Sequence, residues 1–383
     1  MIRHLPLMFR NAIRNRRRSV LTICSVAASL CLLGVMMALY QAMFLSPPTK
    51  EQALRVITRN KISLTNPMPL SYRHKIAQIP GVRAVTVGQW FGGVYKDSKN
   101  FFARIAVEPE YFEQVYPEYK VVQGSMQDFR KERMACAIGK DLAKKFDLKL
   151  GDRMTLIGDI FPVNLDFTIR AIFDVPIDNE SMYFSLQYLY DALPAAQRDQ
   201  AGWFTMQADS PESVSRISQA VDDMFRNSPV QTRTESEKAF QVGFLSFFGD
   251  IKSFLASICA AVTFTILLVT ANTMAMSVRE RVREIGVLKT LGYTNGTILG
   301  IILGEAAVLS FIGGVIGCAL AQGIAIQFHS MPAFIAEFKT LTILPPVAAA
   351  LLAVAVLIGL TGSFVPAWNA SRTGIIDALR YTG

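Results

Sequence analysis

The sequence has few of the residues on which enzyme active sites and metal centres depend. Its 3 histidines, at positions 4, 74 and 329, are too scattered to predict a metal cluster. Only Cys136 of the 5 cysteines lies outside the long apolar runs, and there is no C-x-x-C pair. The patterns G-x-x-x-x-G-K-[ST], G-x-S-x-G and H-E-x-x-H are absent. We therefore expect a non-catalytic chain with no metal, no cofactor and no P-loop of its own.

Charge is also scarce, and it is missing altogether from four long runs. Only 18% of the residues are charged, and each uncharged run reaches the roughly 20 residues that a helix needs to span a bilayer. The basic start before the first run could mark a signal peptide, but the run is about twice as long as a signal's apolar core of about 7–15 residues, which favours a retained anchor. The sequence predicts four transmembrane helices, at residues 19–45, 249–278, 296–328 and 342–368.

The net charge of +9 lies in short segments beside the predicted helices. Residues 1–18 hold six arginines and no acidic residue, and they could form a basic amphipathic helix at the membrane surface or simply a basic flank of the first membrane helix. The loop at 279–295 and the tail at 369–383 are also basic, whereas the long segment between the first two helices is almost neutral. Because positive charge collects on the cytoplasmic side of membrane helices, we expect both termini and the 279–295 loop in the cytoplasm. The same distribution argues against nucleic acid as a partner.

Residues 46–248 alternate strand and helix patterns and predict an α+β domain outside the membrane, between the first and second helices. A strand–helix–strand order near its start returns in residues 202–237, where a helix with a strong N-cap signal follows the strand W-F-T-M-Q-A. We expect the two ends to form one subdomain, at about 50–114 and 201–240, with about 115–200 inserted between them. Residues 329–341, between the third and fourth predicted helices, would be a short external loop.

The segment from Glu235 onward becomes helical and increasingly apolar until it enters the second predicted helix. A continuous helix of this kind would form a stalk joining the external domain to the membrane. Gly243 and Gly249 could interrupt it.

The third predicted helix contains small residues at regular spacing and one acidic residue. Pairs of glycines four residues apart let helices approach closely in lipid; they are Gly300, Gly304, Gly313 and Gly317. Glu305 would lie on the order of 13 Å along the helix, where an ionisable group needs a partner or water. We favour a structural role, capping or bonding to a neighbouring helix, over a place on a substrate or proton path; both stay open.

The loop between the second and third helices carries the most specific pattern. Arginines and glutamates at i,i+4 spacing would share a helical face, an apolar edge of Ile285, Leu288 and Leu291 follows, and Gly292 would end the helix. Thr294 or Asn295 could cap the next helix. Such a helix could be an ordinary interfacial loop, or it could insert into a groove on a cytoplasmic protein. Its candidate residues are Arg279, Glu280, Arg283, Glu284, Ile285, Gly286, Leu288, Lys289, Leu291 and Gly292.

This loop resembles a motif of the FtsX-like permeases, the superfamily of MacB-type efflux and LolC/LolE-type lipoprotein-release transporters. The family motif is R-x-R-E-I-G-x-L-[KR]-A-L-G, and the chain has V-R-E-R-V-R-E-I-G-V-L-K-T-L-G followed by Y-T-N-G-T-I-L-G-I-I-L-G-E-A. Three other stretches are similar to the family: R-N-A-I-R-N-R-R-R-S-V-L-T, A-I-G-K-D-L-A-K-K-F-D-L-K-L-G-D and P-A-W-N-A-S-R-T-G-I-I-D-A-L-R. In the last stretch Ile375 replaces the family's usual proline.

The resemblance implies a permease subunit of an ABC transporter of the mechanotransmission type, in a bacterial inner membrane. Its external domain would be periplasmic, with a porter-like part at the two ends and a sabre-like insert at 115–200. Two such protomers, identical or different, would bind P-loop ATPase subunits, which carry ATP and Mg²⁺, through a coupling helix at 279–292 with Leu288 in the ATPase groove. A periplasmic adaptor would be a further partner.

The ATPase is expected on a separate polypeptide, because only 18 residues precede the first predicted helix. No substrate is implied. Export of a substrate is the leading hypothesis, and lipoprotein release, control of cell-wall hydrolases, or a membrane-anchored scaffold or receptor without an ATPase are the alternatives.

Overall fold

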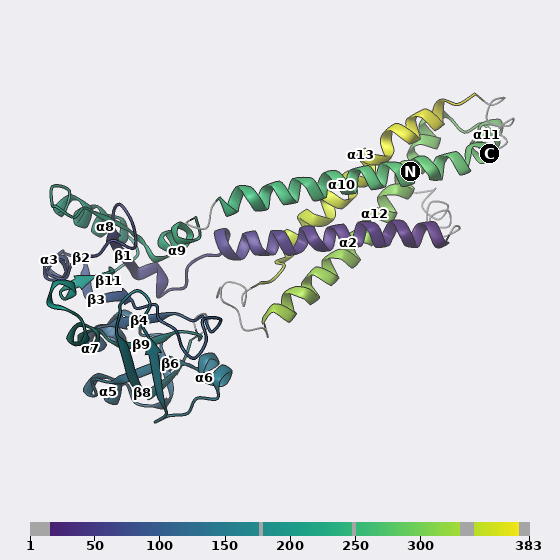
Figure 1. Cartoon of the computed structure of the whole chain (residues 1–383). Helices are drawn as coiled ribbons and strands as arrows, with labels where there is room; N and C mark the ends of the chain where they lie inside the picture. Colours follow the sequence, from purple (N-terminus) through teal and green to yellow (C-terminus); the bar gives the residue numbers. More distant parts are fainter. Residues whose placement is uncertain (1–15, 176–178, 247–249, 330–340, 375–383) are drawn as a thin grey trace. The chain divides into compact units, whose positions relative to one another are not determined.

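The chain forms two compact units in the computed structural model, which describes residues 16–175, 179–246, 250–329 and 341–374 (Figure 1). The units meet in sequence between Ser46 and Pro47 and between Gly249 and Asp250. One unit is helical, and the other is an α/β domain between the first and second long helices. The predicted fold class is therefore confirmed. Three predicted segments lie mostly outside the described residues: the helix at 1–18, the loop at 329–341 and the tail at 369–383.

Four helices of the helical unit are long and apolar enough to cross a membrane, as predicted. They are α2 (Arg16–Tyr40, continued by a π-helical turn, η2, at Gln41–Leu45), α10 (Ile251–Glu280), α12 (Asn295–His329) and α13 (Pro345–Arg372). Pro345 is tolerated because the first turn of a helix does not need its backbone N–H. A short helix, α11 (Val282–Thr290), joins α10 to α12.

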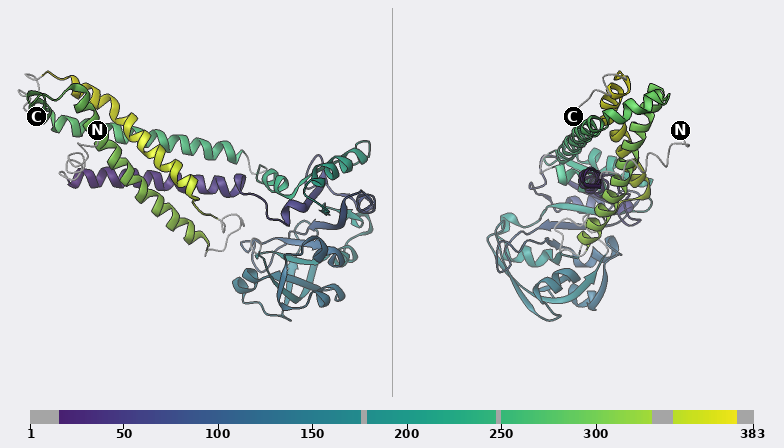
Figure 2. Two further views of the ribbon diagram at one scale, coloured as in Figure 1. Left: turned by 180° about the vertical axis from the view of Figure 1, so that it is seen from behind. Right: turned by 90° about the vertical axis from the view of Figure 1, so that its right-hand side faces the viewer.

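The long helices pack against one another, with α12 in contact with both α2 and α13 (Figures 1 and 2). A Cβ atom at Gly313 would lie 2.8 Å from Val26 Cγ1, and one at Gly317 would lie 2.8 Å from the carbonyl oxygen of Ala27. Gly313 and Gly317, two of the four predicted packing glycines, thus let α12 approach α2 closely. The other two, Gly300 and Gly304, are half-buried.

The external domain is built on one long sheet whose strand order is β12-β1-β11-β3-β4-β9-β6-β8-β5, with β7 beside β8. The strands are β1 (Arg55–Asn60), β3 (Val82–Trp90), β4 (Arg104–Val107), β5 (Lys120–Gly124), β6 (Ala135–Gly139), β7 (Arg153–Ile157), β8 (Asn164–Asp174), β9 (Met182–Ser185), β11 (Trp203–Ala208) and β12 (Thr232–Ser236). A separate ladder pairs β2 (Met68–Pro69) with β10 (Gln200–Ala201). The helices are α3 (Tyr72–Ile76), α4 (Pro109–Val115), α5 (Met126–Lys131), α6 (Lys140–Phe146), α7 (Leu186–Ala192), α8 (Ser213–Met224) and α9 (Glu237–Ser246), with short 3-10 turns η3 (Gln52–Leu54) and η4 (Ala195–Gln197).

The two ends of the domain's sequence meet in one half of this sheet. Strand β1 pairs antiparallel with both β11 and β12, β11 pairs with β3, and α8 contacts all three strands β1, β11 and β12. The repeated strand–helix–strand pattern thus corresponds to β1, α3 and β3 at one end and β11, α8 and β12 at the other.

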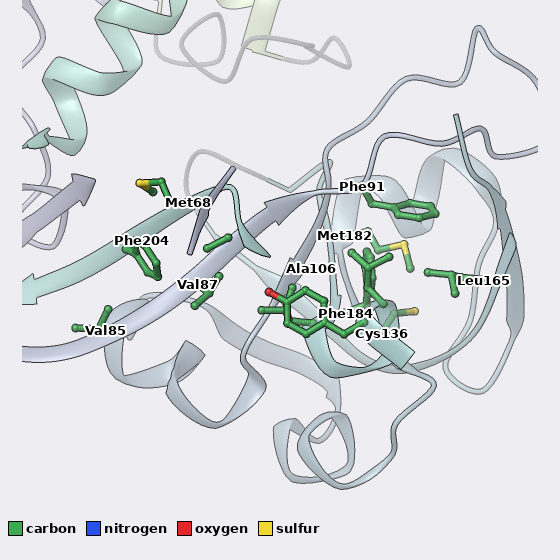
Figure 3. Packing of buried hydrophobic residues seen from close by; sticks show 14 of the residues in the cluster. Met68, Val85, Val87, Phe91, Ala106, Cys136, Leu165, Met182, Phe184 and Phe204 are labelled. Atoms are coloured by element: carbon green, nitrogen blue, oxygen red, sulfur yellow. The ribbon is translucent and has the colours of Figure 1, made fainter. Parts of the chain in front are cut away.

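An aromatic and aliphatic core lies against the sheet (Figure 3). Phe91 and Phe184 meet edge to face with ring centroids 5.7 Å apart, a favourable arrangement for aromatic rings. Cys136 is also fully buried, and burial raises the pKa of its thiol. We therefore do not expect a thiol reagent to label Cys136 from outside.

The expected continuous stalk is interrupted. Helix α9 ends at Ser246, and α10 begins at Ile251 as a new helix. The side chain of Asp250 accepts a hydrogen bond from the backbone N–H of Ser253 at 3.1 Å, and such an N-cap starts a helix because it satisfies a backbone donor of the first turn. Hydrogen bonds from Ser253 also lower the pKa of the Asp250 carboxyl. Residues 247–249 lie outside the described residues.

Candidate functional site

The short helix α11 is separated from α10 by a break at Arg281, which has φ −111° and ψ 10°. Arg279 and Glu280 therefore lie in the last turn of α10, while Arg283 and Glu284 lie in the first turn of α11. The prediction that Arg279 shares a helical face with Arg283, and Glu280 with Glu284, is wrong, because i,i+4 spacing aligns side chains only within an unbroken helix.

The C-terminal end of α11 follows the predicted stop signal. Gly292 has φ +90°, a conformation that glycine adopts without a steric cost. The backbone N–H of Tyr293 then donates to the carbonyl oxygen of Leu288 at 3.1 Å. This is the 6→1 hydrogen bond of a Schellman motif, in which a helix ends at a glycine. Thr294 caps α12, since its Oγ1 accepts a hydrogen bond from Thr297 N at 3.3 Å.

Glu305 has an ion-pair partner at the helix break. Arg281 Nη1 lies 2.6 Å from Glu305 Oε2, and the two side chains are 13% and 5% exposed, respectively. A charged group inside a membrane helix is expensive unless it is paired, so the break residue itself supplies the compensating charge. This contact is the bond to a neighbouring segment that the structural interpretation of Glu305 predicts. The partner was missed because Arg281 looked like one more basic residue of a polar loop.

A cavity of about 40 Å³ lies beside this ion pair, between α10, α11 and α12. Arg281, Glu305 and Leu288 contribute to its lining. A space of this size can hold a few water molecules. Leu288 thus points into the junction of the helices rather than outward.

The inward face of α11 is packed against the rest of the helical unit. Ile285 is buried together with Val278 of α10, Ile298 of α12 and Ala370 of α13. Gly286 is buried beside it. At the other end of the helix, Lys289 Nζ donates to the carbonyl oxygen of Thr373, just after α13, at 2.7 Å. Helix α11 is therefore held to α10, α12 and α13 along its length.

The outward face of α11 carries apolar side chains that nothing in the described part of the helical unit covers. Val287 is 47% exposed and Leu291 is 70% exposed. Arg283 is also exposed, and the three residues are spaced four positions apart, so they lie on the same face of the helix. The apolar edge predicted from the sequence, Ile285–Leu288–Leu291, is thus divided, since only Leu291 belongs to the outward face.

Two family models match the chain. The MacB-like periplasmic core domain matches residues 19–224, more than half of the chain. The FtsX-like permease C-terminal model matches residues 256–375, which include α11 and the Arg281–Glu305 pair.

Similar proteins are ABC transporter components. A macrolide export ATP-binding/permease protein MacB from Chromobacterium violaceum is 41% identical over 108 residues, 28% of this chain and 16% of that protein, so this chain matches only a small part of that relative's length. An uncharacterized ABC transporter permease of Methanocaldococcus jannaschii is 25% identical over 80% of this chain and 77% of its own length. A crystal structure of the periplasmic region of MacB from Actinobacillus actinomycetemcomitans covers 51% of this chain and 96% of that one, with 11% identity and a TM-score of 0.38.

Proposed function

Because the chain belongs to the ABC transporter permeases with a MacB-like periplasmic core domain and an FtsX-like C-terminal part, we propose that it couples ATP hydrolysis on an ATPase subunit to export. In this proposal α11 is the coupling helix. It binds the ATPase with its outward face and passes the ATPase's motion to the long helices through its inward face.

The observation that carries the proposal is the division of α11 into two faces. Val287 and Leu291 are exposed at the end of a helical unit, and an apolar stripe at i,i+4 spacing suits a groove on another protein. Arg283 beside them would steer a partner with an acidic rim.

The fixed inward face supports the second half of the proposal. A docked partner could move α11 only together with its attachments, because Ile285 is packed among three long helices and the two ends of α11 are bonded to α12 and to the end of α13. Packed helices transmit such movements since they cannot deform continuously. A force on α11 would therefore reach α10, α12 and α13 at once.

The distribution of positive charge supports a cytoplasmic position for α11 and for both termini. Arginine-rich segments flank α2 and α11, whereas the periplasmic domain is nearly neutral. The expected location is the bacterial cytoplasmic membrane, with lipid around the long helices. ATP and Mg²⁺ would be bound by the partner ATPase.

A second permease protomer and a periplasmic adaptor complete the proposed assembly. The substrate class stays open, and lipoprotein release or control of a cell-wall hydrolase would use the same coupling helix.

Replacing Val287 with glutamate tests the docking surface. Val287→Glu should abolish co-purification of a P-loop ATPase with the membrane-extracted chain, and with it the stimulated ATPase activity, since an apolar groove excludes an unpaired charge. Membrane insertion and unfolding temperature should stay unchanged because the side chain is exposed.

The matched control is Ile62→Glu, the same kind of change at a residue of the periplasmic domain that is 85% exposed. It should leave the ATPase bound. Retention of the ATPase by Val287→Glu and by Leu291→Glu would overturn the docking role of α11, and absence of any ATPase from the wild-type complex would overturn the proposed function itself.

A further inference from the structure

Arg55, the first residue of β1, is buried in a polar junction inside the periplasmic domain. Its Nε lies 2.5 Å from Glu237 Oε2 and its Nη1 lies 2.5 Å from Glu118 Oε1. The Arg55 side chain is 4% exposed. A planar guanidinium can bind two carboxylates in different directions because its donors form a fixed fork.

An aromatic side chain completes this junction. The Arg55 guanidinium carbon lies 4.9 Å from the ring centroid of Tyr116, within the range of a cation–π contact. Tyr116 in turn donates its hydroxyl to Thr205 Oγ1 of β11 at 3.2 Å. Burial would lower the pKa of Arg55, but Glu237 and Glu118 outweigh this effect and raise it. Burial, reinforced by Glu237, also raises the pKa of Tyr116 to about 12.

The segments joined by Arg55 are those that connect the domain to the membrane helices. Strand β1 begins directly after η3, on the chain that leaves α2. Glu237 is the first residue of α9, which leads to α10. Helix α9 also contacts η3, β1 and β12. Glu118 lies between α4 and β5, so the third arm of the junction reaches the segment leading into the far half of the sheet.

We propose that Arg55 is a positioning residue that locks the chain arriving from α2 and the helix leading to α10 into one rigid piece of the periplasmic domain. Arg55 lies at the end of the connection that arrives from α2, and its guanidinium binds Glu237 at the start of the connection that leads to α10. A movement of α10 that reaches α9 is therefore delivered to β1 and to the loop before β5, instead of being lost in a loose linker. This consequence for transport rests on the proposed function, whereas the lock itself does not.

Hydrogen exchange in the purified full-length chain tests the lock. Arg55→Met should speed the exchange of α9 amides by at least about tenfold, because local opening of α9 no longer breaks an ion pair. Amides of β6 and β7, which do not pair with β1, β11 or β12, should keep their wild-type rates if the domain stays folded.

Glu237→Gln keeps the test decisive if Arg55→Met does not fold. It removes only the charged contact to α9, and Arg55 keeps Glu118 as its partner. It should also speed exchange in α9, by a smaller factor. The matched control is Glu108→Gln, where the carboxylate at the start of α4 pairs with Arg73 at 2.8 Å in the same domain. This control should leave α9 unchanged, and wild-type α9 protection in both Arg55→Met and Glu237→Gln would overturn the lock.

A second measurement separates the lock from the transport mechanism. With the ATPase bound and trapped by ATP and vanadate, exchange in the wild-type periplasmic domain should change. In Glu237→Gln this change should disappear from β1 and from residues 116–119, while ATPase activity persists. An unaltered ATP-dependent response in a variant with loosened α9 would overturn the role in transmission. If the wild-type chain binds no ATPase, the proposed function fails, and α9 exchange still decides whether Arg55 locks the two segments.

Discussion

Two paired arginines, one in each unit, hold helix ends in different ways. Arg281 lies at the break that ends α10 and pairs with one carboxylate, Glu305, on a membrane helix. Arg55 lies at the start of a strand and binds two carboxylates, of which Glu118 is 21% exposed and Glu237 is 14% exposed. Glu305 is 5% exposed, so the carboxylate of the first pair is less accessible to water than either carboxylate of the second junction.

This difference decides what each junction can tolerate. A carboxylate that water reaches keeps part of its solvation when its partner is removed, so the cost is moderate. The Arg281–Glu305 pair offers less such relief because Glu305 is 5% exposed, and loss of one partner leaves a poorly compensated charge. We therefore expect the membrane junction to fail under single substitutions and the domain junction to loosen instead.

The largest effect should follow from Glu305→Leu, which removes the carboxylate that Arg281 binds. Removing one partner of a buried ion pair costs about 3–5 kcal/mol, and the protein should be lost from the membrane or unfold at a much lower temperature. The double variant Arg281→Met/Glu305→Leu should recover most of the loss, because two apolar side chains can replace a buried pair. Thermal unfolding in detergent measures both. A double variant no more stable than Glu305→Leu would show that the two sites are not coupled.

A smaller loss should follow from Gly317→Ala in the same helix. The added Cβ would meet backbone atoms of α2, with Ala27 O at 2.8 Å and Cys31 N at 3.2 Å. Overpacking of this kind costs about 1–3 kcal/mol. The control is Gly323→Ala, where nothing lies within 4 Å of the new Cβ, and it should be neutral or slightly stabilising. Equal unfolding temperatures for the two variants would contradict a close approach of α12 to α2.

In the domain junction, Tyr116→Phe should produce a modest effect. It keeps the ring beside Arg55 and removes the hydroxyl that donates to the buried Thr205. Loss of one such hydrogen bond costs about 0.5–1.5 kcal/mol. The unfolding midpoint of the periplasmic domain should fall, and α9 exchange should stay close to wild type because both ion pairs of Arg55 remain. Faster exchange of the α9 amides in this variant would show that the Tyr116 hydroxyl, and not only the ion pairs of Arg55, locks α9.

The smallest effect should come from an exposed pair in the same domain, Lys140–Asp174. A hydrogen bond from Lys140 and another from Asn179 lower the pKa of the Asp174 carboxyl. A lowered native pKa stabilises the fold above the unfolded carboxyl's pKa of about 3.9, and this contribution disappears as the pH falls through the native pKa. Asp174→Asn should therefore change little at neutral pH and flatten the acid limb of the unfolding profile. A large loss of stability at pH 7 would contradict the expectation that this exposed ion pair stabilises the fold less than the buried pairs do.

Much of the fold was predictable because apolar length and strand–helix order are properties of the sequence itself. Four uncharged runs are long enough to predict four spanning helices. The end of α11 at Gly292 and the cap of α12 at Thr294 follow from local backbone chemistry. Gly313 and Gly317 were likewise predictable as packing residues from their spacing.

Long-range partners were less predictable. Arg281 was overlooked because only the folded bundle brings the break of α10 beside Glu305, 24 positions later. Leu288 is likewise expected in the ATPase groove, but it lines the junction of α10, α11 and α12, which forms only in the folded bundle, while Val287 is exposed. Arg55, Glu118 and Glu237 lie far apart in sequence and gave no pattern at all.

Photo-crosslinking from α11 tests the central claim most directly. A photoreactive amino acid in place of Leu291, on the outward face, should form an adduct with a P-loop ATPase in native membranes, identified by mass spectrometry. The same amino acid in place of Leu288, three residues earlier and directed into the helix junction, should react within the chain instead. An ATPase adduct from position 288 and none from 291, or none from either position, would contradict the proposed coupling face.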